Sequence, residues 1–336
     1  MRESINQVRD LMVQALTVRG LSPDDSGFIA DDFLEAQAEG HLTHGVGKFL
    51  LIDEVLRNRL GEPIEVSRSG GVAVLDGNRE VGQLAARRAA ELAAELAHSH
   101  GVGMVTLRNA SRFSRLTPYA RDIAASGHAA LVTNNAGPAA VTPYGSRTPI
   151  MGTNPIAFGF PRGEGTPYVI DFSTAERVWG EIRQAMLEER PLPDNAFLDA
   201  AGNVTTDPEA VEAVLPFGGH KGAALCIALE MLAGVLAGAA MGGAVTDEYQ
   251  LGAVFLAMKP PAGLTPAGSV DALLTEIRGA APLNGAGPVH APGDRSAAAR
   301  LRAADEGTVE LDPNTKTVLM AMSQGGAGLT ANSLTN

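Results

Sequence analysis

The hydrophobic pattern of the first sixty residues has the period of helices. Over residues 3–18, apolar side chains recur every three or four positions. Ser22 and Pro23 then form a helix start signal, a capping hydroxyl followed by proline in the first turn. A second apolar stripe follows that signal, and a third amphipathic segment covers residues 49–56. The pattern therefore predicts a helical layer at this end of the chain.

Beyond residue 70, short apolar runs alternate with helical patterns, which is typical of an α/β fold. The predicted strands cover residues 72–77, 102–107, 129–133, 168–175 and 253–258, and the predicted helices residues 83–98, 119–125, 176–188 and 270–277. A short helix over residues 298–303, a strand and a last helix complete the pattern. The most apolar segment, residues 223–245, contains Glu230 and several glycines. We expect a buried helix there rather than a membrane span, because a charge is costly in lipid.

These patterns predict three regions in the chain of 336 residues. We expect a helical N-terminal layer over residues 1–70, with residues 285–324 packing back on it. An α/β cofactor- and substrate-binding domain with a mixed sheet is expected over residues 71–284. The small, polar residues 325–336 are expected to form a disordered tail.

Composition narrows the classes of function. The formal net charge is -12 and basic residues form no run, so we expect no nucleic-acid partner. The single cysteine, Cys226, allows no intrachain disulfide and no thiolate metal cluster, which favours a reducing compartment. Residues 1–6 lack the apolar stretch of a signal peptide. We therefore expect a cytoplasmic protein without a membrane or metal partner.

Residues 40–48 are dense in reactive side chains. They hold two histidines, Thr43 and Lys48 between glycines that allow the backbone to turn. Histidine exchanges protons near neutral pH, so His44 is a candidate proton donor. The alternative is that His41 and His44 only cap or pack a turn between helices, and the local sequence leaves both interpretations open.

A second candidate site is the start of the long apolar helix. Residues 217–222 combine three glycines with His220 and Lys221. Free backbone amides and the helix dipole favour an anion there, although a plain glycine turn with Lys221 in solvent is the alternative. The chain has neither a Gly-x-Gly-x-x-Gly fingerprint nor a Walker loop, and its scattered histidines do not indicate zinc. A conventional Rossmann site is therefore not expected.

Taken together, the motifs resemble one family over nearly the full chain. They are, in order, Thr43-His44-Gly45 with Lys48, Asn134-Asn135-Ala136 with Pro138, Gly152-Thr153-Asn154-Pro155-Ile156-Ala157, Thr205-Thr206-Asp207-Pro208, Gly218-Gly219-His220-Lys221-Gly222 and Pro292-Gly293-Asp294. In order and spacing they look like the signatures of the type-2 malate/L-lactate dehydrogenase family. That family includes ureidoglycolate, sulfolactate and diketogulonate oxidoreductases and reductases of cyclic imino acids such as piperideine-2-carboxylate.

The resemblance implies a non-Rossmann α/β fold, a homodimer, and NAD or NADP as cofactor. It also assigns roles to single residues. His44 would be the proton donor, Asp199 a second catalytic residue, and Lys48, where the family usually has arginine, would hold a substrate carboxylate. The remaining assignments are Thr43, Asn135 and Thr153 to the substrate and Asp171, Ser173, Thr174, His220, Lys221, Pro292, Gly293 and Asp294 to the cofactor.

One loop departs from the family pattern. The family usually reads Asn-Ser-Asn-His-Phe-Gly where this chain has Asn109-Ala110-Ser111-Arg112-Phe113-Ser114. Arg112 cannot cycle a proton near neutral pH, but it can clamp a carboxylate with two N–H bonds. Hydride transfer to a ketone needs a proton, whereas transfer to a protonated imine does not. The loss of this histidine therefore favours a C=N substrate, or a ketone protonated by His44 alone.

The leading hypothesis is an NAD(P)-dependent oxidoreductase acting on the α-carbon of a small 2-oxo or 2-hydroxy acid or of a cyclic imino acid. Arg112 and Thr43 are departures at expected catalytic positions. They keep open a repurposed enzyme with a non-redox reaction, such as isomerisation or elimination. The other alternative is a non-catalytic dimeric binding protein. The intact cofactor motifs argue against that last reading.

Overall fold

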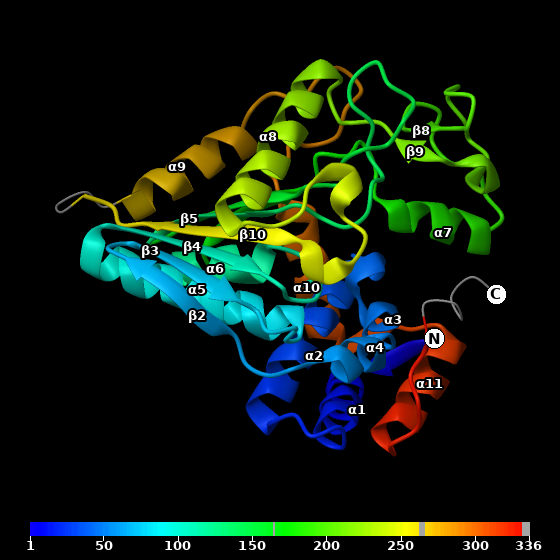
Figure 1. Ribbon diagram of the computed structural model, residues 1–336. Coiled ribbons are helices and arrows are strands. Elements are labelled where there is room, and N and C mark those ends of the chain that lie inside the picture. The colour runs from blue at the N-terminus through cyan, green and yellow to red at the C-terminus, as the bar shows by residue number, and fades with distance from the viewer. Residues whose placement is uncertain (164, 262–265, 331–336) are drawn as a thin grey trace. The chain divides into compact units, whose positions relative to one another are not determined.

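The computed structural model describes residues 1–163, 165–261 and 266–330. The chain divides into two compact units (Figure 1). Met1–Leu60 and Leu274–Asn336 form one, here called the terminal unit, and Gly61–Leu273 form the other, the central unit. The domain boundaries expected from the sequence, after residues 70 and 284, stay a prediction.

The terminal unit is mostly helical, as the period of its apolar residues predicted. Ser22 caps the second helix by accepting a hydrogen bond from the backbone N–H of Asp25 at 3.1 Å. The predicted third helix is in fact two short ones. The elements are β1 (Arg2–Ser4), α1 (Ile5–Thr17), α2 (Pro23–Ala38), η1 (Leu42–His44), α3 (Val46–Phe49), α4 (Ile52–Asn58), α10 (Asp294–Glu306), β11 (Thr308–Glu310) and α11 (Pro313–Ser323), with β1 antiparallel to β11.

Hydrogen bonds connect residues 326–328 to the rest of the terminal unit, while the disorder expected over residues 325–336 stays a prediction. The Arg19 guanidinium donates to the carbonyl oxygens of Met322 at 2.9 Å and Gly326 at 2.6 Å. The backbone N–H of Gly328 donates to an Asp53 carboxylate oxygen at 2.7 Å. These bonds satisfy backbone groups that a polar tail would leave to water. Residues 331–336 lie outside the described residues.

The central unit contains a seven-stranded sheet of order β2-β3-β4-β10-β5-β6-β7. Every neighbouring pair is antiparallel except β3 and β4, so the sheet is mixed, as expected. The strands are β2 (Ile64–Ser69), β3 (Val72–Asp76), β4 (Val102–Arg108), β5 (Ala129–Asn134), β6 (Ile156–Phe160), β7 (Tyr168–Phe172) and β10 (Gly252–Met258). The apolar pattern did not predict β2 or β6. The six residues of β2 are all exposed, and β6 follows a loop rich in Gly, Pro and Asn.

Helices cover both faces of this sheet (Figure 1). On one face lie α5 (Gly82–His100) and α6 (Thr117–Ala125), and on the other lies α8 (His220–Ala237). The alanines of α5 let it approach β4 closely, and a Cβ built on Gly103 would overlap with the carbonyl oxygen of Ala93. Small residues on both elements therefore set the spacing between helix and strand.

The helix α8 is buried on one side only, which corrects the expectation of a buried helix over residues 223–245. Cys226, Leu229, Glu230 and Ala233 face the protein, whereas Val235 is 66% exposed. In the described part of the chain, this is the one helix long and apolar enough to cross a membrane, and 44% of it is buried. The chain leaves α8 at Ala237, before the apolar run ends, because Gly238 adopts the left-handed conformation.

The rest of the central unit is irregular. The helix predicted over residues 176–188 starts late, at Trp179, because an Ala175–Pro216 bridge and a bond from Glu176 N–H to Leu215 keep the chain extended. The remaining elements are α7 (Trp179–Leu187), β8 (Phe197–Leu198), η2 (Pro208–Ala210), β9 (Ala213–Val214), η3 (Gly242–Ala244) and η4 (Glu248–Gln250), while α9 (Pro266–Arg278) has residues in both units.

Candidate functional site

One edge of the central sheet collects most of the candidate residues of that unit. The pairing directions make β3, β4, β5 and β7 run the same way, so their carboxyl ends share an edge. The loops with Arg112, Asn135 and Ser173 leave the sheet there, and β6, preceded by Thr153, begins there. In open α/β sheets ligands bind outside the carboxyl ends of strands, which makes this edge the candidate site.

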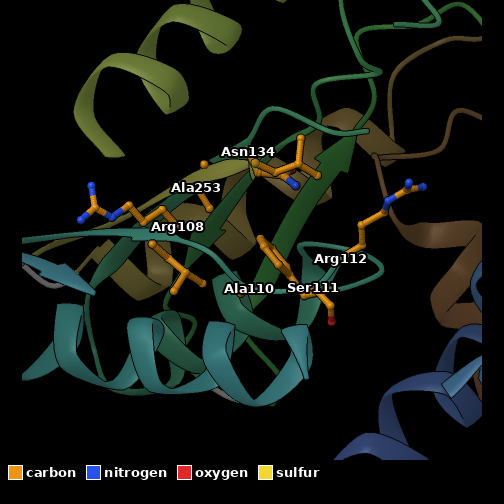
Figure 2. A pocket seen from close by; sticks show the side chains of 10 residues that line it. Arg108, Ala110, Ser111, Arg112, Asn134 and Ala253 are labelled. Atoms are coloured by element: carbon orange, nitrogen blue, oxygen red, sulfur yellow. The ribbon is translucent and has the colours of Figure 1, made fainter. Parts of the chain in front are cut away.

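The loop after β4 buries its backbone and presents Arg112. Ser111 is buried, and its Oγ accepts a 2.8 Å hydrogen bond from Gly82 N–H at the start of α5. Arg112 follows directly, and its side chain is 47% exposed. A small pocket lies at this point, lined among others by Ser111, Arg112 and Asn134. Figure 2 shows Arg108 and Arg112 extending in opposite directions from it.

The Arg112 guanidinium lies near two other parts of the central unit. Its Nε is 3.8 Å from Oε2 of Glu248, a loose ion pair. A Cβ built on Gly137 would lie 3.8 Å from its Nη1. Arg112 therefore reaches the Asn-Asn-Ala-Gly-Pro loop after β5, which brings two of the sequence motifs together.

The amide of Asn135 is committed to the protein itself. Asn135 is 1% exposed, its Oδ1 accepts from Gly252 N–H at 2.7 Å, and its Nδ2 donates to Ala240 O at 2.8 Å. Buried Glu230 joins the same network, accepting from Asn154 Nδ2 at 2.7 Å and Gly242 N–H at 2.8 Å. These bonds join the Asn135 amide to two neighbouring loops, and its expected contact with substrate stays a prediction.

The three cofactor candidates on β7 and beyond shape the strand end. Ser173 and Thr174 donate from their hydroxyls to the carbonyl oxygen of Thr153, each at 3.0 Å. Asp171 accepts from the N–H and hydroxyl of Thr117 at 2.9 and 2.7 Å, at the start of α6. Burial raises the pKa of the Asp171 carboxyl above its ordinary value, against these hydrogen bonds. Thr153, Ser173 and Thr174 thus form one cluster.

The first turn of α8 lies beside that cluster. Phe217 N–H donates to Thr174 O at 3.1 Å, and Gly218 and Gly219 both have positive φ. His220 and Lys221 follow and are exposed. At Gly222 a Cβ would overlap with Phe217 O, so glycine is needed for the tight entry into the helix. The arrangement leaves free amides and two cation-capable side chains at a helix N-terminus.

A cavity of about 270 Å³ lies next to this turn. The described residues that line it are Tyr144, Gly145, Glu176, Asn195, Leu215, Pro216 and Gly219. The Tyr144 ring meets the His220 ring edge-on, with centroids 5.9 Å apart. Sequence reasoning missed Tyr144, Glu176 and Asn195 as a group, because they come from three loops far apart in the chain.

Asp199 shapes a turn after β8. Its carboxylate accepts from the backbone N–H of Asn203 at 2.8 Å and from the Asn203 side chain at 3.2 Å. Hydrogen bonds from Asn203 hold the pKa of Asp199 below its ordinary value. An ionised carboxylate accepts a proton rather than donating one, so any catalytic role of Asp199 is that of a base or an orienting group.

In the terminal unit, His44 ends the short helix η1. Thr43 and His44 are half-buried and Lys48 is exposed. The Gln37 side chain fixes the following turn, accepting from Val46 N–H at 3.0 Å and donating to Glu310 O at 2.7 Å. A Cβ on Gly45 would overlap with Gln37 Oε1, which explains the glycine after His44.

His41 has a packing contact, which favours the structural alternative for this histidine. Its Nε2 lies 3.1 Å from Ser296 Oγ. Pro292, Gly293 and Asp294 enter the same helix, α10, with Gly293 at φ 85°. Asp294 accepts a two-pronged ion pair from Arg278 at 3.0 and 2.7 Å. That ion pair lowers the pKa of Asp294.

The described residues contain no group of three or more His, Cys, Asp or Glu placed to hold a metal ion. Burial raises the pKa of the Cys226 thiol, which is 0% exposed and lies 3.4 Å from Asn154 Nδ2. A buried thiol with a raised pKa is not a nucleophile at neutral pH.

Comparison with known proteins adds relatives over nearly the whole chain. The family model described as malate/L-lactate dehydrogenase matches residues 4–320. An L-sulfolactate dehydrogenase from Methanothermobacter thermautotrophicus is 34% identical over 328 residues, 93% of each chain. A Delta(1)-pyrroline-2-carboxylate/Delta(1)-piperideine-2-carboxylate reductase from Pseudomonas syringae pv. tomato is 32% identical, over 91% of this chain and 92% of the relative.

Solved structures agree with these sequence relatives. The sulfolactate dehydrogenase from Methanocaldococcus jannaschii superposes with a TM-score of 0.87 and 29% identity, covering 97% of each chain. The predicted α/β fold of the dehydrogenase type is thereby confirmed, and so is an enzyme of the dehydrogenase and reductase class. From its motifs, its fold and its relatives, the chain belongs to the malate/L-lactate dehydrogenase family.

Proposed function

We propose that this enzyme transfers a hydride between a nicotinamide cofactor, NAD or NADP, and the α-carbon of a small carboxylate substrate. The observation that carries the proposal is the grouping at one sheet edge. Arg112 follows β4, and the cluster of Thr153, Ser173 and Thr174 lies where β6 begins and β7 ends. The Phe217 N–H connects the first turn of α8 to that cluster by a 3.1 Å hydrogen bond.

The α8 turn fits the phosphates of a dinucleotide. Its backbone amides are free of intrahelical partners, and the exposed side chains of His220 and Lys221 add positive charge. The Thr174 hydroxyl holds the adjoining loop to β6 by bonds to Thr153 O and Asn154 O, each at 3.0 Å. When bound, the nicotinamide ring supplies or accepts the hydride. We also propose that the cofactor contacts Pro292, Gly293 and Asp294.

Arg112 is proposed to grip the substrate carboxylate. A guanidinium presents two parallel N–H donors, which match the two oxygens of a carboxylate. The loose 3.8 Å pair with Glu248 holds Arg112 without satisfying that geometry, so a substrate can take over the contact. We also propose that the substrate contacts Thr43, Lys48 and Thr153. Lys48 would act as a single positive charge near the carboxylate.

His44 is proposed to donate the proton that a ketone substrate needs as its oxygen gains charge. An imidazole titrates near neutral pH, whereas the ionised Asp199 does not donate a proton there. Since Arg112 adds no second proton donor, a protonated cyclic imine is the substrate class least affected by its presence. The proposal therefore covers 2-oxo acids, 2-hydroxy acids and cyclic imino acids, with weight on the imines.

Oxidation of NADH and NADPH with paired substrates tests this function. Pyruvate and a branched 2-oxo acid are compared with piperideine-2-carboxylate and pyrroline-2-carboxylate, using wild-type protein and His44→Gln. We expect turnover of the imines, and a loss of about 10²- to 10⁴-fold for His44→Gln on ketones only. Cofactor binding without turnover of either class would favour the non-redox alternative. No binding of either nicotinamide would overturn the redox function.

A further inference from the structure

The cavity beside α8 has the features of a nucleoside pocket. It measures about 270 Å³ and lies in the central unit, bordered by Gly219, the residue that caps α8. Leu215 and Pro216 give it an apolar wall, and the Asn195 side chain adds an amide. Pockets for cofactors have this mixture of apolar surface and a few polar groups.

Tyr144 provides a stacking surface at this cavity. The ring is 66% exposed and meets His220 edge-on, at an interplanar angle of 72°. An edge-on pair leaves a ring face available, and purine bases stack on such faces. The exposure of Tyr144 places the cavity at the surface, which suits the end of a dinucleotide that takes no part in the reaction.

The charge of the cavity is negative. Glu176 is the one charged side chain among the described residues that line it. Its backbone N–H bonds to Leu215 O at 2.8 Å, which fixes the point where the side chain leaves the main chain. The next residue, Arg177, is not part of this lining, and its Nη1 lies 3.9 Å from Glu181 Oε2. A carboxylate substrate would be repelled here, whereas a ribose diol would find an acceptor.

We propose that this cavity binds the adenosine end of the cofactor, and that Glu176 makes the enzyme specific for NAD. The Glu176 carboxylate accepts hydrogen bonds from the ribose 2′- and 3′-hydroxyls and repels the 2′-phosphate of NADP. The first turn of α8, with His220 and Lys221, would hold the phosphates common to both cofactors. This inference rests on the proposed function, and it names Glu176 as the residue that selects the cofactor.

Calorimetric titration of the full chain with cofactor fragments tests the site directly. The probes are 5′-ADP and 2′,5′-ADP, which carry only the adenosine end. We expect 5′-ADP to bind about tenfold more tightly, and Glu176→Gln to narrow that ratio toward one. The matched control is Glu188→Gln, because Glu188 is an exposed carboxylate paired with Arg190 at 2.6 Å, away from the cavity lining.

Parallel titrations with NADH and NADPH, followed by nicotinamide fluorescence, separate the two proposals. If neither cofactor binds, the redox function itself fails. If both bind but wild-type protein prefers 2′,5′-ADP or does not discriminate, the function stands and the role of Glu176 is wrong. A thermal melt of each variant excludes misfolding, and Glu176→Asp, which keeps the charge, is expected to retain a preference for 5′-ADP.

Discussion

At the scale of single residues, Arg112 lies in a loop that departs from the family pattern. Its neighbours Ser111 and Phe113 are buried, so the loop exposes the guanidinium and hides the residues around it. A buried hydroxyl that caps α5 fixes the loop backbone, which in turn fixes the origin of the Arg112 side chain. A side chain held in this way, on the edge where the strands end, is suited to bind rather than to stabilise the fold.

We expect Arg112→Ala to raise KM for the carboxylate substrate by about 10- to 100-fold, because it removes a charge-assisted pair of hydrogen bonds. Arg112→Lys keeps the positive charge but loses the two parallel N–H donors, so its KM should lie between those of the wild type and Arg112→Ala. Steady-state kinetics give both values. Arg68→Ala is the control, since Arg68 forms an exposed pair with Glu65 on β2. An unchanged KM in Arg112→Ala would contradict the clamp.

At the scale of elements, tight turns between helices and strands position the candidate residues. In the terminal unit, one side chain, Gln37 of α2, bonds both to the turn after His44 and to β11. In the central unit, Glu230 of α8 bonds to the loops that carry Asn154 and Gly242. Each is a buried or half-buried polar group on a helix that fixes the backbone of a loop.

We expect Gly45→Ala to lower activity while leaving cofactor binding unchanged. A Cβ at this position overlaps with Gln37 Oε1, so the glutamine must move and release Val46 N–H. Without the hydrogen bond from Val46 N–H to Gln37, the turn that carries His44 is displaced. The measurements are kcat and a nicotinamide fluorescence titration, with Gly47→Ala as control because a Cβ there has no neighbour within 4 Å. Equal kcat values in the two variants would refute the positioning role.

We expect Glu230→Ala to destabilise the central unit by about 3 kcal/mol, because it removes the carboxylate that accepts from the buried Asn154 amide and the half-buried Gly242 N–H. Urea unfolding followed by the fluorescence of Trp179, which lies in α7 of this unit, gives the free energy. Met186→Ala in α7, where Met186 is 45% exposed, should change it by less than about 0.5 kcal/mol. Comparable losses in both variants would argue against the network.

At the scale of the whole molecule, folding shifts the pKa values of several groups, and the sign of the shift differs from one group to another. In the terminal unit, burial acts to raise the pKa of Asp53, but hydrogen bonds from Arg19 and Gly328 outweigh it and hold the pKa below its ordinary value. The Arg278 pair lowers the pKa of Asp294 in the same unit. In the central unit, burial raises the pKa of Asp171. In the same unit the pKa values of Asp199 and of the buried His128 are lowered, so the central unit holds groups with shifts of both signs.

We expect the terminal unit to lose stability as the pH falls from 6 to 3.5, with Asp53 and Asp294 contributing to the loss. A carboxyl whose pKa is lower in the folded state stabilises above its unfolded pKa, about 3.9, and loses this as the pH falls through the folded pKa. Asp171, with a raised pKa, instead stabilises the fold more as it protonates. Hydrogen exchange at pH 6 and pH 3.5, corrected for the intrinsic rate, measures this loss on peptides of the terminal unit. Asp53→Asn should reduce the change between the two pH values, and an unchanged pH response in this variant would contradict the role of Asp53.

The outer side of α8 is the surface at which we expect the homodimer to form. Its outer side carries Ile227, Met231, Leu232, Val235 and Leu236, each at least 37% exposed, and a second copy of the chain would cover such an apolar face. We expect light scattering to give twice the mass of one chain, and Val235→Glu to reduce it. Leu301→Glu, a change at a 63% exposed residue of α10, is the control. A monomeric wild type would refute the dimer.

The sequence by itself determined what depends on neighbouring residues and on motif order. The period of apolar residues placed α1, α2, α5 and strands β3 to β5 within a few residues, because each helix or strand repeats over a short span. The ordered motifs identified the family, now confirmed over residues 4–320. The local pattern did not predict β2, whose residues are all exposed.

Tertiary structure alone decided which distant segments meet. It placed β10 between β4 and β5, gave Asn135 and Glu230 a shared network, and made Asp171 the cap of α6. Each of these depends on hydrogen-bond partners far apart in sequence, with Asn135 and Glu230 separated by 95 positions. Such partners are set by tertiary packing, so they cannot be predicted from spacing along the chain. The cavity around Glu176 formed for the same reason, from loops that become neighbours only on folding.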